Sequence, residues 1–231
     1  MRALLAVPVI ALCTLAFGTA AVVGGLCDRS GRLGRGLARS WARIILGTLG
    51  VRVEVVGSEN APPGPAVYAA NHSSALDIPI LFGYLPVDFR IIHKRSLYLI
   101  PILGWALYLG GHIGIDRANP FRARKSLGAA AERIRGGTRV AVFPEGTRSP
   151  DARVQPFKRG SFILAAEAGV PVVPVSLLGV KRVVPHGIRT LRPGTVQLTI
   201  HPAIPLAGRA QDAEALAEEV RRIVGAGGGE A

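Results

Sequence analysis

The sequence has little sulfur chemistry. Its 231 residues include only two cysteines, Cys13 and Cys27, and both lie in an apolar stretch near the N-terminus. The rest of the chain therefore has no thiol for a disulfide bond or a metal site. The five histidines also lack the close His or Glu spacing of common metal-binding motifs, so we expect no bound metal.

Signature loops of several enzyme classes are missing as well. The chain contains neither Gly-x-Gly-x-x-Gly nor a Walker loop, so we expect no nucleotide cofactor. It also has no Gly-x-Ser-x-Gly elbow, the turn that exposes a nucleophilic serine in many hydrolases. If the chain is an enzyme that transfers a group, the nucleophile is therefore expected to come from the substrate.

Acidic residues are scarce relative to basic ones. Lys and Arg number 28 against 15 Asp and Glu, which gives a formal net charge of +13. Such a field attracts phosphates, whether on a lipid headgroup, on coenzyme A or on an acidic carrier protein. Only 6% of the residues are aromatic and no zinc-finger or RNA-recognition motif is present, so we expect no nucleic-acid partner.

Charge is entirely absent from residues 3–26, a stretch long enough to cross a bilayer as a helix. In the following residues, apolar side chains and arginines recur at helical spacing on two neighbouring faces, as in a helix that lies at a membrane interface. The apolar positions are Leu33, Leu37, Trp41, Ile44 and Ile45, and the arginines are Arg32, Arg35, Arg39 and Arg43.

Two interpretations of this N-terminal region stay open: a cleaved signal peptide ending near Gly18-Thr19-Ala20, or a retained hydrophobic hairpin. The arginines directly after the apolar run favour the hairpin, attached to the cytoplasmic face of the cell membrane. We therefore divide the chain into a membrane-attachment segment, residues 1–49, and a domain formed by residues 50–231.

After residue 50, short β-branched runs alternate with helical segments, which predicts an α/β fold with a mostly parallel sheet covered by helices. The predicted strands are Val51–Val56, Ala66–Ala70, Phe89–His93, His112–Ile115, Val140–Phe143, Val172–Leu177 and Thr195–Ile200. The predicted helices are Ile78–Leu85, Leu97–Leu109, Pro120–Arg135, Phe157–Ala168 and Asp212–Val224. Ligands of such sheets bind beyond the carboxyl ends of the strands.

A histidine and an aspartate follow the second predicted strand, at His72 and Asp77. A neutral imidazole can take a proton from an alcohol, and a carboxylate on its other nitrogen fixes the tautomer. Five helical steps would put the two side chains on different faces, so the chain must turn between them. Because Pro79 suits a first helical turn, Asp77 could instead be only an N-cap and His72 only a loop residue.

Four blocks in order decide between these alternatives. They are Asn71-His72-x-x-x-x-Asp77, Gly111-His112-Ile113-Gly114-Ile115-Asp116-Arg117, Phe143-Pro144-Glu145-Gly146-Thr147-Arg148-Ser149 and Val170-Pro171-Val172-Val173-Pro174-Val175. Together they resemble the four motifs of the glycerolipid acyltransferase family, whose type members are the 1-acylglycerol-3-phosphate acyltransferases. The third block matches most closely.

This resemblance implies an O-acyltransferase in which His72 deprotonates the acceptor hydroxyl and Asp77 orients His72. It implies transfer of a fatty acyl group from acyl-CoA or acyl carrier protein to a lysophospholipid, most simply lysophosphatidic acid, without a cofactor. The implied partners are these substrates and membrane phospholipids. The implied substrate-binding residues are Glu145, Gly146, Thr147, Arg148, Arg117, Lys94 and Lys158.

Two departures from the family pattern leave the acceptor open. Gly114 stands where the family usually has Phe, and Ser96 occupies a place that is often acidic. Glycerol-3-phosphate, a lyso-aminolipid or a glycolipid are therefore alternative acceptors for the same chemistry. A non-catalytic membrane protein that binds anionic lipid through its arginines is an alternative from another class.

Overall fold

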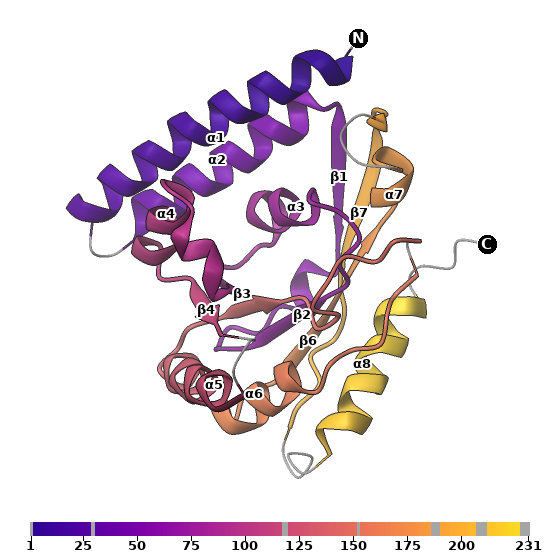
Figure 1. The fold of residues 1–231 in the computed structure, drawn as a ribbon. Helices are drawn as coiled ribbons and strands as arrows, with labels where there is room; N and C mark the ends of the chain where they lie inside the picture. The colour runs from indigo at the N-terminus through magenta and orange to yellow at the C-terminus, as the bar shows by residue number, and fades with distance from the viewer. Residues whose placement is uncertain are drawn as a thin grey trace.

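A seven-stranded sheet forms the centre of the molecule (Figure 1). The computed structural model describes residues 2–28, 31–116, 120–151, 153–185, 190–206 and 212–226. The strands are β1 (Val51–Val56), β2 (Val67–Ala70), β3 (Arg90–Lys94), β4 (Ile113–Ile115), β5 (Val140–Val142), β6 (Val172–Leu178) and β7 (Gly194–Ile200). Their order is β1-β7-β6-β2-β5-β3-β4, and every neighbouring pair is parallel except β6 and β7. The predicted mostly parallel sheet is confirmed.

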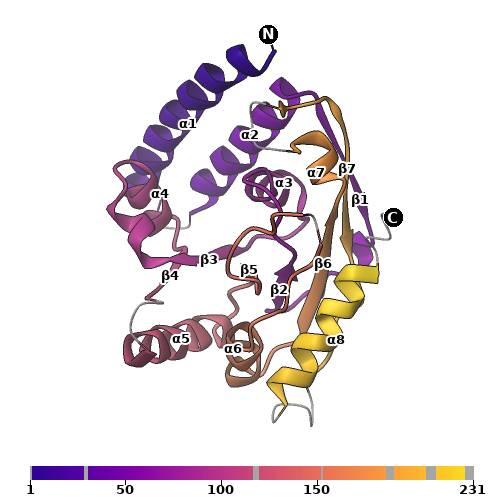
Figure 2. The same ribbon diagram turned by 45° about the vertical axis from the view of Figure 1, so that its right-hand side comes forward.

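Helices cover both faces of this sheet. They are α1 (Arg2–Cys27), α2 (Arg32–Thr48), α3 (Asp77–Tyr84), α4 (Leu103–Leu109), α5 (Pro120–Arg135), α6 (Gly160–Ala168), α7 (Val180–Val183) and α8 (Ala213–Ala226), with 3-10 turns η1 (Ser58–Asn60) and η2 (Arg95–Leu99). The first four helices lie on one face, and α5, α6 and α8 lie on the other (Figures 1 and 2). The result is a three-layer α/β/α arrangement.

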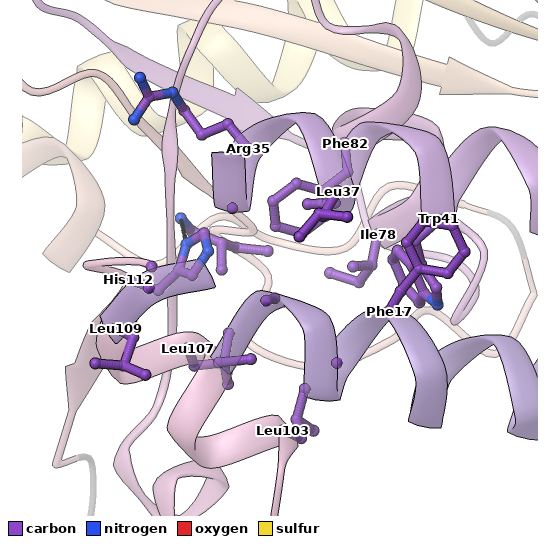
Figure 3. A pocket seen from close by; sticks show the side chains of 18 of the residues that line it. Phe17, Arg35, Leu37, Trp41, Ile78, Phe82, Leu103, Leu107, Leu109 and His112 are labelled. Carbon is purple, nitrogen blue, oxygen red and sulfur yellow. Dashed lines mark hydrogen bonds between the residues drawn. The ribbon is translucent and has the colours of Figure 1, made fainter. Parts of the chain in front are cut away.

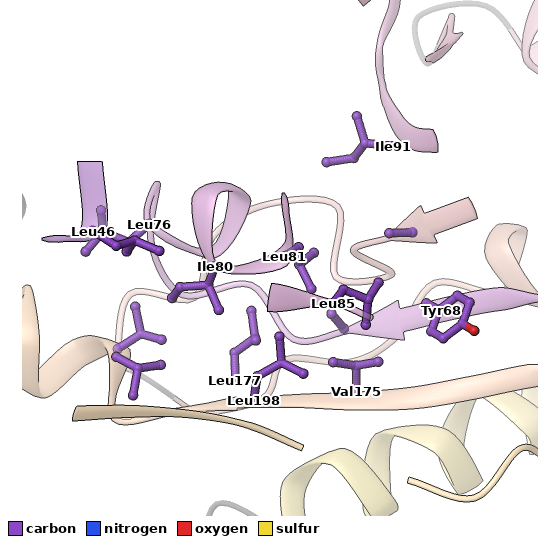
Figure 4. Close-up of a cluster of buried hydrophobic side chains, with 14 of the residues drawn as sticks. Leu46, Tyr68, Leu76, Ile80, Leu81, Leu85, Ile91, Val175, Leu177 and Leu198 are labelled. Atoms are coloured by element: carbon purple, nitrogen blue, oxygen red, sulfur yellow. The ribbon is translucent and has the colours of Figure 1, made fainter. Parts of the chain in front are cut away.

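The sheet buries side chains on both faces because its strands alternate between two cores. Tyr68 of β2 points into the cluster shared with α2 and α3, whereas Val67 joins the cluster under α5, α6 and α8. Figure 4 shows the first cluster, in which Leu46 and Ile80 face Leu198 of β7. Full burial of one such aliphatic side chain stabilises the fold by about 1.5–3 kcal/mol.

The N-terminal helices belong to the same packed body as the sheet. In α2, Ala42 and Leu46 are completely buried, and the indole N–H of Trp41 donates to Thr14 of α1 over 3.1 Å. A division at residue 49 is therefore not a break between separate cores. It remains a proposal about which part meets the membrane.

One predicted helix is wrong. The segment Leu97–Leu109 is not continuous, because η2 ends at Leu99 and α4 begins at Leu103. Between them Ile102 has φ 64°, a conformation that no helix contains. Its side chain packs against α1 at Gly18, where an added Cβ would lie only 2.8 Å from Ile102 Cγ2. This contact between distant parts of the chain overrides the local helical pattern.

The topology brings three of the predicted site segments to one edge. Strands β2, β5 and β3 are adjacent and parallel, so their carboxyl ends meet at the same side of the sheet. The residues that follow or end these strands are His72 after β2, the Phe143–Ser149 block after β5 and Lys94 at the end of β3. This is the edge at which open α/β sheets bind ligands.

Candidate active site

His72 and Asp77 form a hydrogen-bonded pair just beyond β2. The distance from His72 Nδ1 to Asp77 Oδ2 is 2.7 Å, and the Asp77 side chain is completely buried. The same oxygen accepts the backbone N–H groups of Ser73 and Ser74 at 2.7 and 2.8 Å. Since a carboxylate only accepts, Nδ1 of His72 carries the proton and Nε2 presents a lone pair.

Asp77 does not act as an N-cap. It is the first residue of α3, and the capping position, Leu76, makes no side-chain hydrogen bond. The carboxylate turns back toward the preceding loop instead of toward the helical N–H groups. The capping hypothesis is therefore wrong, and the carboxylate serves the loop that carries His72.

The third sequence block holds His72 by its backbone. Glu145 Oε1 accepts the N–H of His72 at 2.6 Å, and the N–H of Ser149 donates to the His72 carbonyl at 2.7 Å. The ring of Phe143 stacks on the imidazole with 4.1 Å between centroids. Sequence motifs included these residues, but only the folded chain shows that they fix both the position and the plane of the imidazole.

Both oxygens of Glu145 are occupied by the protein. Oε2 accepts the backbone N–H of Gln155 at 3.1 Å, and the residue is only 3% exposed. Burial raises the pKa of Glu145, although the N–H groups of His72 and Gln155 oppose the rise. The substrate contact expected of Glu145 would therefore have to share a carboxylate already bound to the backbone.

Asn71, directly before the histidine, ties β2 to β6. Its Nδ2 donates to the Leu177 carbonyl at 3.0 Å, and its Oδ1 accepts the Leu177 N–H at 2.7 Å. This reciprocal pair mimics one rung of a sheet at the point where β2 ends. The one sequence signal for this role is the position of Asn71 inside the first block.

A glycine turn places a lysine over the third block. Gly146 has φ 75°, and an added Cβ would lie 3.0 Å from Lys158 Nζ. The backbone N–H of Lys158 also donates to the Pro144 carbonyl at 3.0 Å. A side chain at residue 146 would meet both a strained backbone and the ammonium group.

The remaining predicted binding residues lie in water at this edge or outside the described residues. Thr147, Arg148, Lys158 and Lys94 are exposed, while Arg117 lies outside the described part of the chain. Arg148 follows Gly146 in the β5–α6 loop, and Lys94 ends β3, the strand next to β5. Within the described ranges, no group of three His, Cys, Asp or Glu side chains is close enough to hold a metal ion.

A search of protein families matches residues 52–178 to the model described as Acyltransferase. The chain belongs to the acyltransferase family. A 1-acyl-sn-glycerol-3-phosphate acyltransferase of Chlamydomonas reinhardtii is 45% identical over 157 residues, 67% of this chain and 47% of that protein. A protein of the same name from Pseudomonas aeruginosa is 35% identical over 179 residues, 75% of this chain and 69% of that protein.

The solved structures include a similar acyltransferase. The 1-acyl-sn-glycerophosphate (LPA) acyltransferase PlsC from Thermotoga maritima superposes with a TM-score of 0.79 at 31% identity, covering 98% of this chain and 96% of that one. The chain spans about half the length of the first curated relatives that it matches. The fold is thus shared over nearly the whole chain, and the family model covers residues 52–178.

The unusual glycine of the second acyltransferase block has a packing reason. An added Cβ at Gly114 would lie 2.4 Å from the ring of Tyr98. The Tyr98 hydroxyl accepts the Gly114 N–H at 3.1 Å and donates to the His112 carbonyl at 2.7 Å. The aromatic ring of Tyr98 therefore occupies the space that a Phe at residue 114 would need.

Beside this edge the chain has a large, mostly apolar cavity of about 690 Å³ (Figure 3). Helices α1, α2, α3 and α4 and strand β3 contribute to its wall. The lining includes Ile78 and Phe82 of α3, the helix that begins with Asp77, but neither His72 nor Asp77 itself. Its volume lies within the range of about 300–1,000 Å³ found for small-molecule sites.

A neutral histidine, His112, borders the cavity. Its Nδ1 accepts the backbone N–H of Ile91 at 3.0 Å, so Nε2 carries the proton. Burial, with smaller contributions from Arg90, His93 and Arg133, lowers the pKa of His112 to about 3. The unfolded chain binds this proton at higher pH than the native chain does, so stability falls as pH drops from about 6.5 toward 3.

We therefore expect His112→Asn to reduce the acid sensitivity of the fold, because its Oδ1 can still accept the Ile91 N–H. Between pH 7 and pH 5, the wild-type chain should lose about 2 kcal/mol more stability than the variant. Urea unfolding of both proteins in the same detergent at the two pH values measures the difference. Parallel pH dependences would mean that His112 has the same pKa in the native and the unfolded chain, which would contradict the expected lowering.

Proposed function

We propose that this chain transfers a fatty acyl group from an acyl thioester to the free hydroxyl of lysophosphatidic acid. The observation that carries the proposal is the His72–Asp77 pair, with its free Nε2 at the carboxyl edge of the sheet. The family membership and the names of the matched relatives support the acceptor. Acyl-CoA and acylated acyl carrier protein both carry the fatty acyl group as the required thioester.

The proposed reaction needs one base and no covalent enzyme intermediate. Nε2 of His72 removes the proton from the acceptor hydroxyl while its oxygen attacks the thioester carbonyl. Asp77 stabilises the imidazolium that forms. The C–S bond then breaks, and the departing thiolate takes the proton from Nε2, which restores the neutral imidazole.

The candidate serines and cysteines do not suit a nucleophilic role. Ser73 and Ser74 are buried, and Ser74 Oγ accepts the Leu76 N–H at 3.2 Å. Both cysteines lie in α1, in the N-terminal helical layer. Direct attack by the substrate hydroxyl is therefore the simpler mechanism.

In this proposal the exposed cations hold phosphate, and the buried carboxylate positions the base. Arg148 offers a planar guanidinium that binds phosphate through two hydrogen bonds, and Lys94 and Lys158 add positive charge at the same edge. Arg117 is proposed for the same role from its motif. Gly146 and Thr147 present the loop backbone to the substrate, while Glu145 acts mainly by holding the backbone of His72.

The apolar cavity is the proposed site of a fatty acyl chain. Replacing Ala38, one of its lining residues in α2, by Phe fills part of that space. We expect Ala38→Phe to lower turnover of long-chain donors roughly tenfold or more relative to short-chain donors, because overpacking costs about 1–3 kcal/mol.

Competition between donors of different chain length measures this preference. Ala215→Phe, an exposed alanine of α8, is the matched control and should leave the profile unchanged. Identical profiles for Ala38→Phe and the wild-type chain would remove the acyl chain from this cavity.

We also propose that the enzyme works at the cytoplasmic face of the cell membrane. Of the described helices, α1 is long and apolar enough to cross a bilayer by length and composition, and only 6% of its apolar window is buried. The arginines of α2 follow directly, and the exposed Arg32 is the one proposed to reach anionic headgroups. Arg35 instead pairs with Asp88 at 3.0 Å, and Arg43 donates to the Gly83 carbonyl at 3.0 Å. The N-terminal helices thus supply the proposed contact with membrane phospholipids.

The decisive experiment is turnover by the purified chain with acyl-CoA and acyl carrier protein as parallel donors. Lysophosphatidic acid is the expected acceptor, and glycerol-3-phosphate, a lyso-aminolipid and a glycolipid are run beside it. Acylation of another acceptor alone would reassign the substrate and the phosphate-binding residues. Liposome binding without turnover of any pair would favour a non-catalytic lipid-binding protein.

A further inference from the structure

Apolar side chains protrude from the segment between β3 and β4. We call residues 99–108, from the end of η2 through most of α4, the α4 segment. Within it Leu99 is 84% exposed, Trp105 57% and Tyr108 73%, and Ile100 and Leu103 are also exposed. Soluble proteins rarely expose so many large apolar side chains within ten residues, so this patch indicates an interaction surface.

A strained turn shapes the α4 segment. Ile102 has φ 64° and ψ −58°, and the N–H of Leu103 donates to the Pro101 carbonyl at 2.7 Å. This is a γ-turn of the rarer, positive-φ form, which a β-branched residue adopts only under constraint. The turn packs Ile102 against Gly18 of α1 and leaves Ile100 exposed on one side.

The exposed patch continues the apolar surface of α1. Helix α4 packs along α1 (Figures 1 and 2), and an added Cβ at Gly25 would lie 2.9 Å from Leu109 Cβ. Val23 and Leu26, from the same end of α1, are exposed as well. An apolar surface therefore extends from α1 onto α4 without an intervening layer of protein.

The chemistry around the patch matches a lipid surface. Lys94 and Arg95, both exposed, lie at the start of η2, a few residues before the α4 segment, and can bind phosphate headgroups. Trp105 and Tyr108 are the two residue types that gather at the boundary between headgroups and acyl chains. A protein partner would need a complementary surface, whereas a bilayer satisfies an apolar patch flanked by cations without one.

We propose that the α4 segment is a second membrane contact, which enters the same leaflet as the outer face of α1. This inference rests on the proposed function at a membrane. Ile100, Pro101 and Leu103 also line the cavity, so the contact places a wall of the cavity directly against lipid. Lipid-borne chains then reach the cavity sideways from the leaflet.

Tryptophan fluorescence tests the contact without measuring turnover. The chain has two tryptophans, so Trp41→Phe leaves Trp105 as the single probe. The full-length variant is bound to phosphatidylcholine–phosphatidylglycerol vesicles with or without lipids brominated in the upper acyl chain. We expect brominated lipid to quench Trp105 and acrylamide to quench it weakly.

The matched control is a tryptophan on the far edge of the sheet. Val56→Trp, with both native tryptophans replaced by Phe, places the probe at an exposed position of β1. This probe should show the opposite pattern, with strong acrylamide quenching and none by brominated lipid. If Trp105 behaves like the control, the proposed contact is wrong. Protection of Trp105 from both quenchers would mean that protein covers the patch, which also overturns it.

A kinetic experiment tests the consequence of the contact. The double variant Leu99→Ser, Tyr108→Ser should raise KM for vesicle-borne lysophosphatidic acid about tenfold while leaving kcat and the use of a short-chain soluble acceptor unchanged. Val56→Ser is the control. An unchanged KM would contradict the inference. Absence of turnover in the wild-type chain would instead remove the proposed function, and the fluorescence result would still stand.

Discussion

Purified His72→Ala protein is expected to lose about 10²-fold or more in acyl transfer while keeping its fold. Among the described side chains at the end of β2, the imidazole of His72 offers a base at Nε2, since Nδ1 is bound to Asp77. The backbone of His72 should stay in place because Glu145 and Ser149 hold it through its N–H and carbonyl groups. The measurement is kcat with a saturating thioester donor, beside a circular dichroism melt.

A second histidine provides the matched control for this experiment. His201 follows β7, is half-buried and forms a 2.7 Å hydrogen bond with Ser176 of β6. It does not belong to the loop that carries His72. Replacing it with Ala removes a comparable side chain, so turnover should change little. Near-full activity in His72→Ala, or an equal loss in both variants, would contradict the proposed mechanism.

The sheet was predictable because its strands carry strong local signals. Each predicted strand lies within two residues of an observed one, and α5 has the predicted bounds Pro120–Arg135. Short β-branched runs separated by helices leave few topologies other than a parallel sheet. The antiparallel placement of β7 has no such signal, because strand direction depends on the connection through α7 and not on composition.

The dyad was predictable, but its support was not. The spacing of His72 and Asp77 required a turn, which the structure contains. The hydrogen bond from the His72 backbone N–H to Glu145 joins residues 73 positions apart, and no sequence periodicity encodes such a contact. The sequence motif predicted that Glu145 contacts the substrate. Sequence alone cannot show that both of its carboxylate oxygens already accept backbone N–H groups.

The cavity and the break in the helix at Ile102 could not be predicted from the sequence either, because both depend on contacts between residues far apart in the chain. The cavity wall combines residues from α1 through His112, the residue before β4, and no single segment has an unusual pattern. At Ile102 the local periodicity favours one helix, but contact with Gly18 selects a strained turn. Tertiary packing between the N-terminal helices and the α4 segment therefore decides both features.

Asp77→Asn should cost about 10²- to 10⁴-fold in turnover, the second large effect that we expect. Asp77 Oδ2 accepts N–H groups from His72, Ser73 and Ser74. The amide oxygen of Asn can take this place, so the loop and the tautomer of His72 should survive. The amide is neutral, however, and can no longer stabilise the imidazolium that forms when the acceptor hydroxyl loses its proton.

A double-mutant cycle separates this charge effect from general damage to the site. If Asp77 acts only through His72, the variant with both His72→Ala and Asp77→Asn should be no slower than His72→Ala alone. Kinetics of the four proteins under one saturating donor give the coupling directly. Additive losses would show that Asp77 has a role independent of the imidazole. The loop at Ser73 and Ser74, whose N–H groups share the same oxygen, would then be the first place to look for it.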